Sequence, residues 1–143
     1  MLLLLASLPA WATLGQTTVS LKADQARLHG RWTYEQHAGY RVARLRAADG
    51  LVLREYVSGA GLVFGVTWRG PRPPDMAALL GRYFAEYQQA AKQLVRRRGP
   101  WVLRTAHLVA SMSGHLRAFR GSAWIPALMP PGTRLAGSRM IRQ

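Results

Sequence analysis

The side chains that can act as acids, bases or metal ligands are few in this sequence. It contains 6 Asp plus Glu, 4 His and no Cys, so thiolate nucleophiles, cysteine-held iron–sulfur clusters and Cys-type zinc sites are excluded. No His-x-x-x-His or Glu-x-x-His pair occurs to bring metal ligands together on a helix, and no Walker loop is present to hold a nucleotide. We therefore expect neither a metal ion nor a cofactor.

One group of residues has the types that hydrolysis requires. His107 or His115 could act as a base, with Ser113 as the nucleophile or Glu55 as the acid. The usual signatures of a nucleophilic serine, Gly-x-Ser-x-Gly and Ser-x-x-Lys, are absent. A turn is a simpler interpretation of Ser113-Gly114-His115 than an active site. An envelope hydrolase built on these residues is the alternative to a function without catalysis.

Positive charge is the stronger chemical feature. The chain has 20 Lys plus Arg, of which 18 are Arg, and a formal net charge of +14. Codon usage in a GC-rich genome can also produce such an arginine content. Guanidinium groups bind phosphates and carboxylates bidentately, so we predict an anion-binding surface. Its candidate residues lie close to aromatic side chains in the sequence and are Arg41, Arg44, Arg69, Arg96, Arg97, Arg98, Arg117 and Arg120.

The N-terminal residues have the pattern of an export signal. Leu2 to Leu8 form an apolar run, and Ala10-Trp11-Ala12 has the small-x-small pattern that signal peptidase accepts, so residues 1–12 are predicted to be cleaved off after Ala12. No Lys or Arg precedes the run, which leaves open an upstream start site, a weak signal or a buried N-terminal segment. The run is shorter than the roughly 20 apolar residues that cross a membrane, so we expect no transmembrane helix.

Which anionic partners the protein can meet depends on whether it is exported. For a periplasmic or secreted protein these are lipid headgroups, lipopolysaccharide, cell-wall polymers or an envelope protein. Nucleic acid would be the leading partner only if the chain stayed in the cytosol, where guanidinium groups bind phosphates and aromatic rings stack on bases. A solvated basic face with no ligand is the simplest interpretation of the charge. The sequence alone specifies neither the ligand nor the oligomeric state.

The elements that must hold these residues begin with β-structure. An Asp-Gly pair at 49–50 between two extended runs favours a tight hairpin. Apolar residues at every second position from Leu62 to Trp68 indicate a strand with one buried face. A short helix over 18–28 is expected first, and a weak alternation over 31–38 indicates a strand; three strands in meander order follow at 40–47, 51–58 and 62–68.

A long helix is the clearest element. Apolar residues recur at a spacing of three and four after Asp75, which is placed to cap the first turn. Gly99-Pro100 ends this helix, so the prediction is one helix over about 75–98. Beyond it, runs at 101–110 and 115–124 flank Ser111 to Gly114 and predict a second hairpin, with an irregular tail from about 126.

Together these elements predict a single α+β domain over residues 13–143. We expect an antiparallel sheet of about five or six strands, a meander plus a C-terminal hairpin, packed against the long helix with the short N-terminal helix beside it. A half-open barrel that wraps the helix is the alternative. In the predicted second hairpin His115 lies opposite Ala110, and His107 lies opposite Ala118.

Several segments resemble a known family. Arg54-Glu55-Tyr56-Val57-Ser58, Leu79-Leu80-Gly81 with Tyr83-Phe84, and Gly114-His115 with Arg117-Ala118-Phe119 are similar to an exported bacterial family called domain of unknown function family 2844. The resemblance spans roughly residues 13 to 135. It implies secretion and one compact domain, and it brings no catalytic residue to any position of this sequence. The heavy arginine load departs from the family pattern.

Overall fold

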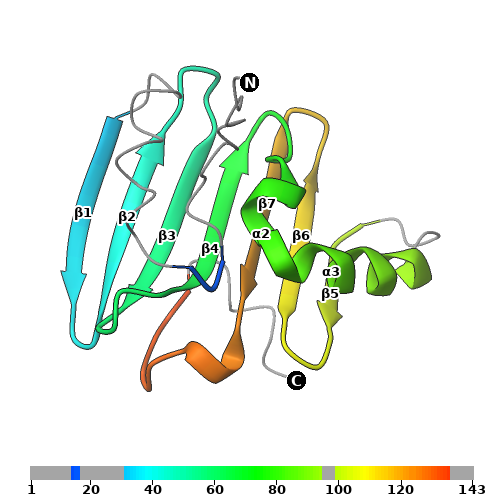
Figure 1. Cartoon of the computed structure of the whole chain (residues 1–143). Helices are drawn as coiled ribbons and strands as arrows, with labels where there is room; N and C mark the ends of the chain where they lie inside the picture. The colour runs from blue at the N-terminus through cyan, green and yellow to red at the C-terminus, as the bar shows by residue number, and fades with distance from the viewer. Residues whose placement is uncertain (1–13, 17–30, 95–98, 136–143) are drawn as a thin grey trace, which may run out of the picture.

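The protein is built on one large antiparallel sheet. The computed structural model describes residues 14–16, 31–94 and 99–135. These form a seven-stranded sheet in the order β1-β2-β3-β4-β7-β6-β5, with a helical segment against one face (Figure 1). The α+β class and the antiparallel sheet are confirmed, whereas the expected five or six strands are too few. Strands β1 and β5 lie at opposite edges of this order, so the sheet is open and not a half-open barrel around the helix.

The first four strands form a meander, in which β1 extends the three predicted strands by one. The Asp49 side chain accepts a hydrogen bond from the Leu51 amide at 3.0 Å, and Gly50 has a φ of +90°, a value that favours glycine. This turn fixes the register in which β2 pairs with β3. The bounds of the strands are β1 Arg31–His37, β2 Tyr40–Arg46, β3 Val52–Ser58 and β4 Val63–Gly70.

The helical segment is not the single helix that its apolar spacing predicted. It consists of α2 Met76–Leu80, the 3-10 turn η2 Gly81–Tyr83, α3 Phe84–Ala91 and the 3-10 turn η3 Lys92–Leu94. Asp75 caps α2 as predicted, accepting a hydrogen bond from the Ala78 amide at 3.2 Å. The helix breaks at Gly81 because this residue has a φ of +51°, which ends α2.

The last three strands correct the prediction of one hairpin over 101–124. The chain forms β5 Trp101–Arg104, β6 Val109–His115 and β7 Ala118–Trp124. It turns at 105–108, where the Thr105 amide donates to the Leu108 carbonyl at 2.8 Å, and again at 116–117. Ser111 to Gly114, predicted as the turn, lies within β6. As a result Ala110 pairs with Ala123, and His115 pairs with Ala118.

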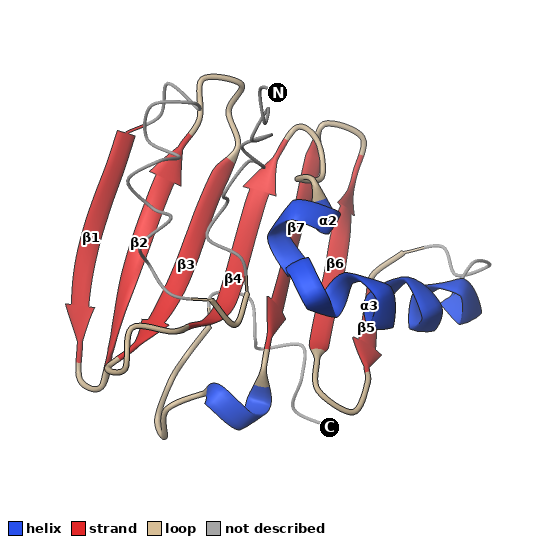
Figure 2. Ribbon diagram, viewed as in Figure 1, coloured by secondary structure: helices blue, strands red, loops and turns tan. Residues whose placement is uncertain are grey.

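Each face of the sheet is covered by a different part of the chain. On one face Leu79, Leu80 and Tyr83 of the helical segment belong to the main core cluster, together with Leu53 and Trp68 of the sheet. On the other face the segment 125–135, which includes the 3-10 turn η4 Pro126–Leu128, crosses the ends of the strands (Figure 2). It packs on an aromatic cluster formed by Tyr40, Tyr56, Phe64 and Trp124. The other half of this second face has no covering element among the described residues.

Some predictions fall on residues outside the described ranges. They are the signal peptide at 1–12, the short helix at 18–28, and the part of the long helix that carries Arg96, Arg97 and Arg98. Within the described ranges no helix has the length and apolar character needed to cross a membrane.

A close approach between two central strands gives the first testable prediction. Trp68 of β4 pairs with Gly121 of β7 and is only 3% exposed. A Cβ atom on residue 121 would collide with the Trp68 indole and lie 2.7 Å from the Ser111 carbonyl oxygen. We expect Gly121→Ala to lower the free energy of unfolding by about 1–3 kcal/mol in urea denaturation. Gly59→Ala is the control, because a Cβ there meets nothing within 4 Å; equal urea midpoints for the two variants would contradict the prediction.

Candidate functional site: an arginine-rich face of the sheet

Arginines gather on the uncovered half of the second sheet face. The register places Arg31 opposite Arg46, Arg44 opposite Arg54, and Arg69 opposite Arg120. Side chains alternate between the two faces of a strand, so these residues point away from the face on which their neighbours Leu45, Leu53 and Trp68 enter the main core. We call this surface the arginine face; its arginines are Arg31, Arg44, Arg46, Arg54, Arg69 and Arg120.

The positive charge of this face is not balanced by acidic side chains. The ion pairs among the described residues join Asp49 to Arg72 at 3.1 Å, Glu86 to His107 at 3.1 Å and Glu35 to His37 at 3.6 Å. None of them includes an arginine of the arginine face. Glu35 of β1 is the one carboxylate on this face within the described ranges.

The guanidinium groups repel one another. Burial and the neighbouring charges of Arg46 and Arg54 lower the pKa of Arg44, and the carboxylate of Glu35 opposes this shift. The Nε atom of Arg44 is also buried without a hydrogen-bond partner among the described residues. Like charges directly opposite each other on neighbouring strands destabilise a sheet. An anion on this face would relieve that repulsion.

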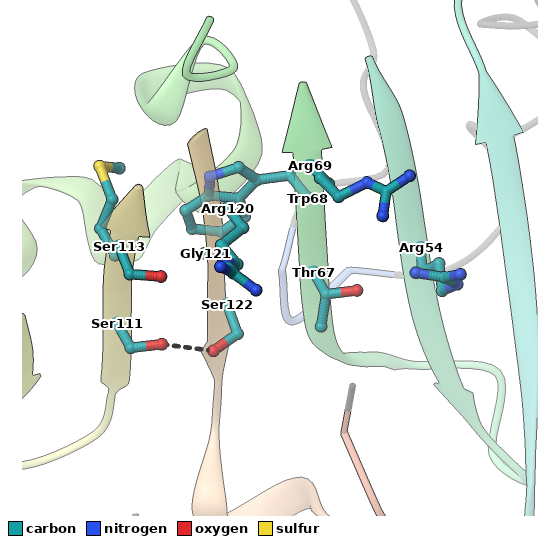
Figure 3. A pocket seen from close by; sticks show the side chains of 10 residues that line it. Arg54, Thr67, Trp68, Arg69, Ser111, Ser113, Arg120, Gly121 and Ser122 are labelled. Carbon is teal, nitrogen blue, oxygen red and sulfur yellow. Dashed lines mark hydrogen bonds between the residues drawn. The ribbon is translucent and has the colours of Figure 1, made fainter. Parts of the chain in front are cut away.

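A hollow of about 290 Å³ lies over β3, β4, β7 and β6, on one side of the arginine face. Three guanidinium groups line it, those of Arg54, Arg69 and Arg120, and they come from three different strands (Figure 3). Four residues with hydroxyl groups also line it, Thr67, Ser111, Ser113 and Ser122, and the other lining residues are Trp68, Met112 and Gly121. No carboxylate is part of this lining. The hollow therefore combines positive charge with hydrogen-bond donors.

The hydroxyl groups differ in how they are satisfied. Ser111 Oγ and Ser122 Oγ are 2.7 Å apart and share one hydrogen bond. Thr67 is 4% exposed, and its Oγ1 atom is buried with no hydrogen-bond partner among the described residues. Figure 3 shows Thr67 between Arg54 and Arg120, with Arg69 on the same strand. A buried hydroxyl that lacks a partner is uncommon in folded proteins and destabilises the protein that contains it.

A second hollow of about 430 Å³ adjoins the first. The two share Arg69 and Arg120, and the second also contains Arg117 and His115 at the β6–β7 turn. Arg117 has a φ of +66°, which is uncommon for a residue other than glycine. Together the two hollows cross the ends of β4, β7 and β6 on one side of the sheet.

The structure places the predicted anion-binding residues in three different locations. Arg44, Arg69 and Arg120 lie on the arginine face, and Arg117 lies at its rim. Arg41 lies on the opposite face, with its guanidinium carbon 6.0 Å from the centre of the Tyr34 ring. The remaining three candidates, Arg96, Arg97 and Arg98, lie outside the described residues.

Sequence reasoning missed two central residues, Arg54 and Thr67. A signal for Arg54 was available, because Arg44 and Arg54 are each five residues from Asp49, the middle residue of the Ala48-Asp49-Gly50 turn, and a hairpin centred there pairs them. No comparable signal marks Thr67, because it stands in an otherwise apolar strand and acquires its surroundings only when β7 pairs with β4.

The residues of the alternative hydrolase do not come together. His107 lies in the β5–β6 turn, whereas His115 ends β6 at the opposite end of that strand. Glu55 is buried on the face that carries the main core, away from Ser113. His107 instead contacts Glu86 through both its amide and its Nδ1 atom, each at 3.1 Å. No hydrogen bond in the described part of the chain links Ser113 to a histidine.

Fold and site define an α+β protein with an open antiparallel sheet and one cationic sheet face. The chain belongs to the family described as Protein of unknown function (DUF2844), whose model matches residues 10–136. The resemblance noted from the sequence is thereby confirmed. No curated protein and no solved structure matches the chain. The family description assigns no activity.

The contact between Glu86 and His107 predicts a pH-dependent stability. Hydrogen bonds from the Thr105 hydroxyl and from His107 lower the pKa of Glu86, and burial opposes the shift. A carboxylate with a lowered pKa stabilises the folded state above its unfolded value of 4.5, and this stabilisation is lost as the pH falls through the folded value. We expect Glu86→Gln to lower the free energy of unfolding by about 0.5–1 kcal/mol near pH 7 and by less near pH 3, because the stabilisation declines as the pH falls below 4.5.

Urea denaturation at the two pH values measures this difference. Glu35→Gln is the control, because Glu35 lies 3.6 Å from His37 on an edge strand and its side chain is 69% exposed. A deficit of the Glu86→Gln variant that is equally large at both pH values would show that the carboxylate charge is not the cause.

Repulsion across the arginine face predicts that one substitution will stabilise the protein, in contrast to Glu86→Gln. Because Arg54 is directly opposite Arg44, we expect Arg54→Gln to raise the urea midpoint at low ionic strength. The gain should shrink in high salt, which screens the repulsion. Arg41→Gln, on the other face, should show no such gain. A lower urea midpoint for Arg54→Gln at both ionic strengths would mean that its packing contributes more than its charge does.

Proposed function

We propose that this protein is an exported, non-catalytic protein that binds an anionic component of the cell envelope through the arginine face. The observation that carries the proposal is the gathering of six arginines on the uncovered half of the sheet, with no acidic partner in any ion pair of the described residues. Basic residues that are spread through a sequence need not lie on the same surface. In this protein the register of five strands brings six arginines onto one face of the sheet.

The arrangement suits an anion better than it suits solvent alone. Guanidinium groups on neighbouring strands stand close enough to contact one phosphate or carboxylate together, and each can donate two parallel hydrogen bonds. The same spacing costs stability when no anion is bound, since it opposes Arg44 to Arg54. The arginine face thus destabilises the protein when no ligand is bound, and its charge is complementary to anions. Both properties support a role in anion binding.

The start of the described fold supports export. Leu14 is fully buried, its amide donates to the Leu79 carbonyl at 3.1 Å, and the Gly15 amide donates to the Val63 carbonyl at 2.7 Å. These contacts begin just after the predicted cleavage site at Ala12. Removal of residues 1–12 would leave them intact, as is required of a signal peptide that is not part of the mature fold.

Intact mass spectrometry of the protein from a periplasmic or culture fraction tests the export step. We expect a mature chain that begins at Thr13, because Ala10 and Ala12 provide the small side chains that signal peptidase needs. Substitution of Ala12 by a bulky residue should leave the uncleaved mass. A full-length chain found only in the cytosol would contradict export and would restore nucleic acid as a partner to test.

Co-sedimentation with lipid vesicles tests the binding step. We expect the mature protein to sediment with phosphatidylglycerol vesicles but not with phosphatidylcholine vesicles. Binding should weaken steeply between about 0.1 M and about 1 M salt, because the Debye length falls from about 10 Å to about 3 Å. Arg44→Gln with Arg46→Gln removes two charges from the arginine face; at about 1 kcal/mol per basic residue, the affinity should fall roughly 30-fold.

The matched control removes two charges from elsewhere. Arg41→Gln with Lys92→Gln gives the same net charge, but Arg41 lies on the opposite sheet face and Lys92 is exposed at the end of the helical segment. We expect this variant to bind the anionic vesicles nearly as well as the unaltered protein. Equal loss of affinity in the two double variants would show that only the net charge matters and would exclude the arginine face as the site.

A further inference from the structure

We infer that the hollow lined by Arg54, Arg69 and Arg120 is a specific site for a phosphomonoester group, with Thr67 at its floor. The inference rests on the proposed function and names the chemical group that the face selects. A phosphomonoester carries up to two negative charges and three terminal oxygens on a tetrahedral phosphorus. The hollow offers a matching set of donors, which come from four adjacent strands.

The strand register places three arginines around Thr67. Arg54 pairs with Thr67 across the β3–β4 ladder, Arg69 is two residues further along β4, and Arg120 pairs with Arg69 across the β4–β7 ladder. Directly opposed Cβ atoms are about 5 Å apart and diagonal neighbours about 7–8 Å, distances that arginine side chains easily span. Figure 3 shows Arg54 and Arg120 on opposite sides of Thr67. Three cations can therefore converge on one anion.

The floor supplies hydroxyl donors. Thr67 Oγ1 is buried and has no hydrogen-bond partner among the described residues, so its hydrogen is available for an acceptor in the hollow. Ser111 and Ser122 share a single hydrogen bond at 2.7 Å, and the hydroxyl that accepts it keeps its own hydrogen for a further acceptor. No carboxylate lines the hollow to compete as that acceptor.

This combination distinguishes between kinds of anion. A carboxylate has two oxygens and one charge, and a phosphodiester has two free oxygens and one charge, so each offers three guanidinium groups and a hydroxyl donor less negative charge and fewer acceptor sites than a phosphomonoester does. We therefore expect a phosphomonoester to bind more tightly. The adjoining hollow, which shares Arg69 and Arg120, leaves room for the alcohol part of the ligand. Inorganic phosphate, a sugar phosphate and the headgroup of phosphatidic acid share this chemistry.

Isothermal titration calorimetry of the mature protein provides the test. The probes are glycerol 3-phosphate and inorganic phosphate, with dimethyl phosphate and acetate as the singly charged comparisons. We expect the two phosphomonoester-type probes to bind at least about tenfold more tightly than the comparisons, because more charge-assisted hydrogen bonds form. Equal affinity for glycerol 3-phosphate and dimethyl phosphate would overturn the inference.

The hydroxyl group is tested by an isosteric change. Thr67→Val keeps the volume of the side chain and removes the donor, so we expect affinity for glycerol 3-phosphate to fall roughly tenfold. Thr33→Val is the matched control, because Thr33 lies on the same face opposite Arg44 and outside the hollow; it should change the affinity less than about twofold. Ser122→Ala is a second variant that removes a donor from the same floor, and it should also weaken binding.

Vesicle binding separates this inference from the proposed function. Thr67→Val should still sediment with phosphatidylglycerol vesicles, because their diester headgroups attract the whole arginine face. If Thr67→Val and Ser122→Ala leave the affinity for glycerol 3-phosphate unchanged while Arg44→Gln with Arg46→Gln weakens vesicle binding, the specific site is excluded and the anionic face stands. If the unaltered protein binds neither vesicles nor phosphate, both are excluded. Preferential sedimentation with phosphatidic acid vesicles would identify a lipid as the source of the phosphomonoester.

Discussion

The strand register is the constraint on which the rest of this structure depends. Because successive side chains alternate between faces, the pairing that buries Leu45, Leu53 and Trp68 against the helical segment also sends the residues between them to the other face. Arg44, Arg54, Thr67 and Arg69 stand at those intervening positions. A shift of one residue would bury the arginines and expose the leucines, so the energy of the core holds the charges together. The arginine face is in this sense a consequence of the core.

The covering elements decide where the face remains open. The helical segment protects one side of the sheet, and the chain after β7 protects only the aromatic half of the other side, around Tyr56 and Phe64. The polar rows further along the same strands have no cover among the described residues. Apolar side chains are thus buried on both sides of the sheet, while one end of one side stays accessible to a ligand. The proposed binding surface and the apolar contacts that stabilise the sheet therefore lie at different ends of the same strands.

Local signals predicted the first half of the fold well and the second half less well. The Asp49-Gly50 turn and the alternation that ends at Trp68 are encoded by adjacent residues, and the meander follows from them. The β5–β6 turn contains neither glycine nor proline and is closed by Thr105 and Leu108, so it left no recognisable signal, and a serine-rich strand was interpreted as a turn. The hollow could not be predicted either, because its lining residues come together only when β4 pairs with β7, and no local sequence signal indicates that pairing.

Some interactions on the arginine face destabilise the protein when no anion is bound, and a bound anion would make them favourable. The opposed pair Arg44 and Arg54 and the orphaned hydroxyl of Thr67 each destabilise the protein without an anion, and they lie next to one another across β2, β3 and β4. Elsewhere the described chain pairs other charged groups, as when Asp49 pairs with Arg72 or Glu86 with His107, but the indole Nε1 atoms of Trp32 and Trp68 are also buried without a hydrogen-bond partner among the described residues. What distinguishes the arginine face is that opposed like charges and an unpartnered hydroxyl lie beside a hollow, and this combination supports the proposed site, whose missing contacts a ligand would supply. In that proposal, binding of an anion offsets the local cost to stability.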